Sequence, residues 1–174
     1  MTTPNEVRNE WLGLGVATIL TAYAAYLVPS WTGALGDPCR QAMILAALTI
    51  VLLFITRSLG PRGIAVERIV LAFFLAGMPL IYIRRWFLEG PQSASWLGVE
   101  IFGLAVYAVL ALLGYRKSPW ILAAGIAAHG LVWDAIHYRS DYIPTWYAIG
   151  CLVVDVGLGL YIAARIPAWR QAEA

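Results

Sequence analysis

Apolar residues occur along this chain in six long runs, which are separated by short segments rich in proline, glycine and charged residues. Each run approaches the roughly 20 residues that an α-helix needs to cross a bilayer. The runs lack the alternation of apolar and polar residues that a membrane β-barrel strand requires. The pattern therefore predicts an all-α polytopic membrane protein with six transmembrane helices, at residues 11–28, 42–56, 64–83, 96–115, 119–138 and 144–165.

Composition supports this class. Hydrophobic residues make up 61% of the 174 residues and charged residues only 13%, against roughly a quarter charged in an ordinary soluble domain. No soluble domain fits between the predicted helices, so we expect a single membrane-embedded domain over residues 1–174. The formal net charge of +2 is small and its charges are scattered, which argues against a nucleic-acid partner.

The distribution of basic residues predicts the orientation. Segments on the side of both termini hold eight of the twelve arginine and lysine residues. By the positive-inside rule, the N-terminus and the C-terminus are then cytoplasmic. We expect the protein to be integral to a membrane, in a bacterium the cytoplasmic (inner) membrane. Within the third helix, Pro79 is expected to introduce a kink.

The only two histidines, His129 and His137, lie in the predicted helix 119–138 together with Asp134. Neighbouring predicted helices carry Glu100 and Asp155. An ionisable side chain at membrane depth is costly unless it is paired or hydrated, so these residues indicate a functional site. The candidate catalytic residues are His129, Asp155, Glu100, His137 and Asp134.

Helical geometry predicts which of these side chains share a face. At 100° per residue, His137 lies about 80° from His129, whereas Asp134 lies about 140° from it. Small residues occupy the face of Asp134 and let two membrane helices approach closely: Ala123, Ala127 and Gly130. We therefore expect Asp134 in a tight helix contact beside the histidine face, within hydrogen-bonding reach of His137.

The three C-terminal predicted helices are joined by very short loops, which predicts that they pack as antiparallel neighbours. We expect all five candidates to converge in one cavity in the exoplasmic half of the membrane. Aromatic and small residues near them are candidates for substrate binding: Trp133, Tyr107, Tyr138 and Cys151.

This set of residues favours an intramembrane enzyme. Burial disfavours the charged forms of carboxyl and imidazole groups, so Glu100 or Asp155 is expected to donate a proton that His129 or His137 accepts. Such acid–base chemistry suits isomerisation, cyclisation or hydrolysis of a lipophilic small molecule held within the bilayer. No cofactor is required for it.

A single zinc or iron ion is compatible with one histidine and the carboxylates, but it is not favoured. His129 and His137 lie ~12 Å apart along one helix, so both cannot bind the same ion. Another alternative is a small-molecule binding or uptake component, acting as a homo-oligomer or with a separate membrane partner. The first three helices carry no counterpart of the polar pattern, which argues against a self-contained carrier built from inverted repeats.

Overall fold

The computed structural model describes residues 37–89, 94–140 and 143–173, in which every regular element is helical. Five helical segments are long and apolar enough to cross a membrane: Pro38–Arg57, Arg62–Leu88, Trp96–Arg116, Pro119–Tyr138 and Thr145–Ala172. They confirm the helical class and the second to sixth predicted helices. The first predicted helix, residues 11–28, lies outside the described residues, so six spans, their orientation and the single domain stay predictions.

Apolar side chains cover the outside of these helices. Phe54, Phe73, Phe102 and Leu160 are each between 62% and 68% exposed. Seven ionisable side chains of the described helices are instead buried: Glu67, Arg84, Glu100, His129, Asp134, His137 and Asp155. This is the reverse of the distribution in soluble proteins, and it fits helices that face hydrocarbon.

The described residues belong to two compact units, which meet in sequence between Val70 and Leu71. The first unit contains α2 (Pro38–Arg57) and the start of α3 (Gly60–Gly77). Asp37 caps α2 by accepting a 3.0 Å hydrogen bond from the backbone N–H of Cys39. Because of this cap and the proline that follows it, α2 begins four residues before the predicted start.

The second unit contains the end of α3 and six further helical elements: α4 (Leu80–Glu89), α5 (Ala94–Arg116), α6 (Pro119–Ala128), η1 (His129–Asp134), α7 (Ala135–Tyr138) and α8 (Thr145–Glu173). A turn at Met78 and Pro79 separates α3 from α4, which confirms the expected kink. Helix α8 continues through Pro167, beyond the predicted end at residue 165.

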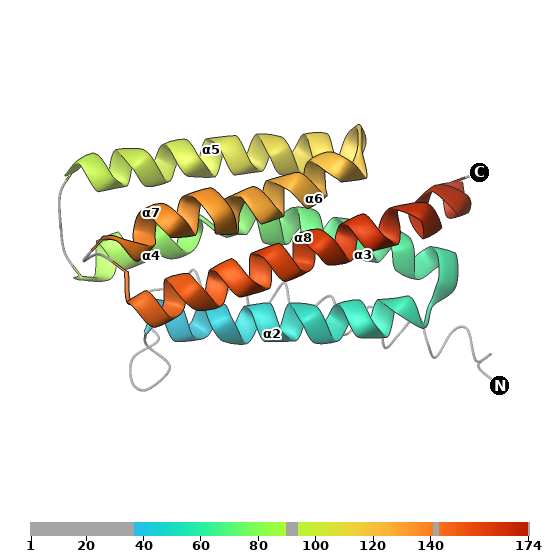
Figure 1. Ribbon diagram of the computed structural model, residues 1–174, viewed down its shortest axis with the longest axis horizontal. Helices are drawn as coiled ribbons and strands as arrows, with labels where there is room; N and C mark the ends of the chain where they lie inside the picture. Colours follow the sequence, from blue (N-terminus) through green and yellow to red (C-terminus); the bar gives the residue numbers. More distant parts are fainter. Residues whose placement is uncertain (1–36, 90–93, 141–142, 174) are drawn as a thin grey trace. The chain divides into compact units, whose positions relative to one another are not determined.

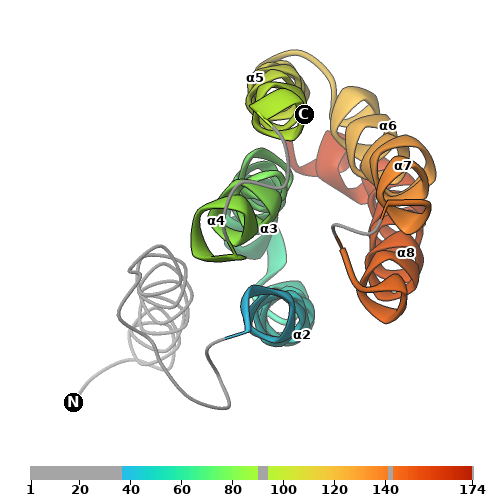
Figure 2. The same ribbon diagram turned by 90° about the vertical axis from the view of Figure 1, so that its left-hand side faces the viewer.

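Helix α6 packs against α5 on one side and α8 on the other, and η1 and α7 continue along α8 (Figures 1 and 2). Small residues bring α6 and α8 together. A Cβ atom added to Gly159 of α8 would lie 2.8 Å from the Cβ of Ala127 and 2.9 Å from the carbonyl oxygen of Ala123. The predicted small-residue face is therefore confirmed as the contact of α6 with α8.

Candidate functional site

A π-helical turn, η1, interrupts the helix that carries both histidines. In a π-helix the backbone hydrogen bonds join residues five apart, so those residues lie almost above one another. His129 and Asp134 are five apart, and Nδ1 of His129 lies 3.8 Å from Oδ1 of Asp134. The predicted separation of the two side chains is wrong because it assumed α-helical winding throughout.

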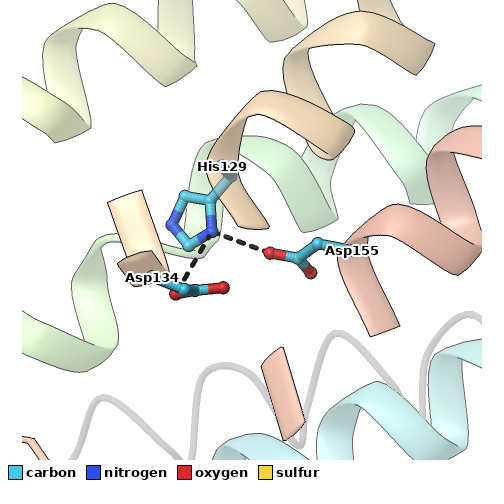
Figure 3. A group of neighbouring side chains, drawn as sticks. All are labelled: His129, Asp134 and Asp155. Atoms are coloured by element: carbon cyan, nitrogen blue, oxygen red, sulfur yellow. Dashed lines mark hydrogen bonds and ion pairs between the residues drawn. The ribbon is translucent and has the colours of Figure 1, made fainter. Parts of the chain in front are cut away.

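Helix α8 brings a second carboxyl group to the same ring nitrogen. Nδ1 of His129 lies 2.8 Å from Oδ2 of Asp155, and both side chains are buried (Figure 3). This approach depends on Gly130, since a Cβ atom there would lie 2.9 Å from the Cβ of Asp155. His129, Asp134 and Asp155 thus form one buried group, here called the His129 cluster.

Tyr82 of α4 is a third helix's contact with the His129 cluster. Its hydroxyl group donates a hydrogen bond to Oδ1 of Asp134, and its ring stacks on His137 with 4.2 Å between ring centroids. Sequence reasoning did not identify Tyr82 as a site residue. The only signal for it was its position one turn after Pro79, where the new helix begins.

Two atoms of the His129 cluster have no hydrogen-bond partner among the described residues. They are Nε2 of His129 and Oδ2 of Asp134, and both atoms are buried. Figure 3 shows Nε2 on the side of the ring that faces away from Asp155. Because buried polar atoms in folded proteins are nearly always hydrogen bonded, these two atoms are where a ligand or water would meet the cluster.

His137 pairs with Glu100 rather than with Asp134. Nε2 of His137 lies 2.7 Å from Oε1 of Glu100, and Nδ1 lies 2.8 Å from the backbone oxygen of Trp133. A carbonyl oxygen only accepts, so Nδ1 is the donor to it. One proton then lies between Nε2 and the carboxyl group, and the pair is neutral overall whichever partner holds that proton.

The five predicted residues therefore form two groups instead of one. Asp155 reaches the beginning of η1 from α8, while Glu100 reaches α7 from α5. Tyr82 connects the groups, since it donates to Asp134 and stacks on His137. The indole N–H of Trp133 donates a 3.3 Å hydrogen bond to Glu100. Tyr107 packs edge-on against His129 with 4.8 Å between ring centroids.

A cavity of about 410 Å³ lies between α7 and the first turns of α8, and Asp134 is part of its wall. Its lining residues come from the end of η1, from α7 and the residue after it, and from α8: Asp134, Ala135, Tyr138, Arg139, Ala148, Ile149 and Leu152. The volume falls within the range of small-molecule sites. Of the residues predicted to bind substrate, Tyr138 is part of this lining. Cys151 is half-buried and is not part of it.

The His129 cluster also has the donor types that a zinc or iron ion accepts. One ligand atom each of His129, Asp134 and Asp155 lies within 4.8 Å of the others. Hydrogen bonds from Tyr82 and His129 already engage one oxygen of each carboxyl group. Both carboxyl groups thus take part in hydrogen bonds in the described arrangement, while the residue types of the cluster could also hold one ion.

Comparisons with protein-family models, with curated proteins and with solved structures find no match to this chain. The functional argument therefore rests on the geometry of the site.

Replacement of Gly103 by alanine should destabilise the second unit by about 1–3 kcal/mol, the usual cost of overpacking. The new Cβ would overlap the indole ring of Trp133, which would have to shift from its present position. Thermal unfolding in detergent measures the effect. Gly98→Ala on the same helix is the control, because nothing lies within 4 Å of its added Cβ. Equal melting temperatures for the two variants would contradict this account of the packing.

Proposed function

We propose that this chain is an integral membrane enzyme that performs acid–base chemistry on a lipophilic small molecule bound between α7 and α8. One observation carries the proposal: Asp134 belongs both to the buried His129 cluster and to the wall of the 410 Å³ cavity. A proton-exchanging group therefore adjoins a space of suitable size for a ligand. Isomerisation, cyclisation and hydrolysis are the reaction types that such a site suits.

In this proposal Asp134 is the catalytic residue that touches the substrate. Tyr82 engages its Oδ1 atom, while Oδ2 has no hydrogen-bond partner among the described residues. Oδ2 is therefore the atom that gives a proton to the substrate or takes one from it. The neighbouring His129–Asp155 pair stabilises the ionised form of Asp134, because the proton between them can shift to His129 and place a positive charge beside that carboxylate.

The Glu100–His137 pair has a supporting role in the proposal. It binds the indole N–H of Trp133, and His137 stacks on Tyr82, which in turn donates to Asp134. These contacts fix two aromatic rings beside the catalytic carboxyl group. Glu100 and His137 are therefore positioning residues rather than proton carriers to the substrate.

The proposal is tested by incubating the full-length protein in nanodiscs with a mixture of lipophilic compounds, and following each compound by mass spectrometry. We expect the wild-type protein to convert one compound to a product, and Asp134→Asn to bind that compound without converting it. Asp37→Asn, at the start of α2, is the control and should retain conversion. A compound that binds the wild-type protein and is recovered unchanged would instead indicate a binding or uptake component.

We also propose that the protein lies in a bacterial cytoplasmic membrane with both termini in the cytoplasm. Lys117 and Arg139 are exposed and flank the helix formed by α6, η1 and α7. With Cys39 and Cys151 replaced by alanine, a membrane-impermeant maleimide should label Arg139→Cys on intact cells. It should label Lys117→Cys only after lysis, and the opposite pattern would reverse the orientation.

The proposed chemistry requires no metal ion. We expect elemental analysis of the purified protein to find less than about 0.1 equivalent of zinc or iron. In the proposal the residues of the His129 cluster exchange protons and do not act as metal ligands. About one equivalent in the wild-type protein and none in His129→Ala would contradict this expectation. His137→Ala is the matched control, since His137 belongs to the other pair.

A further inference from the structure

The cavity between α7 and α8 extends from the end of a membrane-crossing segment toward its interior. The segment ends at Tyr138, so Arg139 lies at the level where lipid headgroups meet the hydrocarbon. Asp134 lies five residues earlier, which places it about 7 Å deeper along the helix axis. The two charged residues of the lining thus stand at different depths.

The wall formed by α8 is apolar, with Ala148, Ile149 and Leu152. Ile149 is 47% exposed and Tyr138 is 51% exposed. These two lining side chains are therefore also exposed on the outer surface of the helices, where the acyl chains of the bilayer lie. An occupant that reaches this cavity from the bilayer contacts an apolar wall along its length.

Arg139 contributes a cation to this mostly apolar space, whose lining also includes Asp134. It is exposed, and no carboxyl group in the described parts of the chain forms an ion pair with it. A guanidinium group binds phosphate or carboxylate through two parallel hydrogen bonds. Charge complementarity therefore favours an occupant with an anionic group at headgroup depth.

We propose that the cavity binds an anionic membrane lipid, with its phosphate on Arg139 and its apolar part along the wall formed by Ala148 and Ile149. The linkage between the headgroup and the chains then lies at the depth of Asp134. This inference names a substrate class for the proposed function, and it rests on that function only for the claim that the lipid reacts. Lipid binding itself stands on the cavity and its charges.

The experiment presents the purified full-length protein with equal amounts of phosphatidylglycerol and phosphatidylcholine in mixed micelles, and native mass spectrometry counts the retained lipids. We expect the wild-type protein to prefer phosphatidylglycerol by about tenfold, the scale of one charge-assisted contact. Arg139→Gln should lose this preference. Arg116→Gln, an exposed arginine at the end of α5, should keep it.

A second arm tests the cavity rather than the charge. Ile149→Trp places a larger ring in the lining and should reduce retention of both lipids, with an unchanged melting temperature. Val153→Trp is the matched control, because Val153 lies one turn further along α8, is 65% exposed and is not part of the lining. We expect Val153→Trp to retain lipid like the wild-type protein.

The proposal is overturned if Arg139→Gln keeps the preference, or if Ile149→Trp retains lipid as the wild-type protein does. It is also overturned if soluble glycerol 3-phosphate displaces the lipid at equal concentration, since the site would then bind a free anion. Asp134→Asn should still retain the lipid. If the lipid is bound but chemically unchanged, only the enzyme proposal is contradicted. If Arg139→Gln converts a neutral compound, only the lipid proposal is contradicted.

Discussion

Asp155→Asn is expected to lower the rate of the proposed reaction by about 10²–10⁴-fold, the usual contribution of general acid–base catalysis. Asparagine has nearly the same shape as aspartate and can still bond Nδ1 of His129, so the contact of α8 with η1 should persist. The amide, however, cannot give a proton to His129 when Asp134 becomes ionised. The substrate-binding constant should change little, because Asp155 is not part of the cavity wall.

Separate measurement of kcat and KM tests this expectation, with thermal unfolding as the check on folding. The loss should appear in kcat, and Asp155→Glu should recover part of it because a carboxyl group is present again. A wild-type kcat in Asp155→Asn would exclude Asp155 from the mechanism. If Asp155→Asn and His129→Ala both lose their melting transition, the pair serves the packing of α8 and not the reaction.

Glu100→Leu should produce the largest loss of stability, about 2–4 kcal/mol. The change removes the partner of Nε2 of His137 and of the indole N–H of Trp133, and each buried group left without its hydrogen bond costs about 1–3 kcal/mol. Single hydrogen bonds between membrane helices average only about 0.6 kcal/mol. The expected cost therefore comes mainly from burying Nε2 of His137 and the indole N–H of Trp133 without a hydrogen-bond partner.

Unfolding by a denaturing detergent, monitored by circular dichroism, measures this loss. Glu100→Gln is the matched control, since its amide can accept from Trp133 and donate to His137, and we expect a cost below about 1 kcal/mol. The double variant Glu100→Leu with His137→Leu should cost less than the sum of its parts. Equal destabilisation by glutamine and leucine would contradict the account, because the pair would then require a charged carboxylate.

Much of the framework of the site follows from the sequence. The positions of five described helices follow from the length of the apolar runs, because hydrocarbon thickness sets that length for any membrane helix. The burial of Glu100 and Asp155 agrees with the cost of an ionisable side chain at membrane depth, which favours a paired position in the interior. The contact of α6 with α8 likewise follows from the small residues at Ala123, Ala127 and Gly130, because only such residues allow the backbones to approach closely.

The pairing of acids with histidines could not be predicted from helical spacing. Spacing along one helix shows which side chains share a face, but partners on other helices depend on how each helix is rotated and shifted in the bundle. Asp155 was thus a candidate for either histidine, and so was Glu100. The packed helices assign Asp155 to His129 and Glu100 to His137.

The amino-acid sequence by itself determined the helical class and the exclusion of a metal ion shared by both histidines, because these depend on hydropathy and on the 1.5 Å rise per residue. The tertiary structure alone decided that Asp134 joins His129, because η1 winds more slowly than an α-helix and brings residues five apart onto one face. It also decided that Tyr82 reaches Asp134 and that Asp134 borders a cavity. Both depend on the approach of separate helices, which no spacing within one helix specifies.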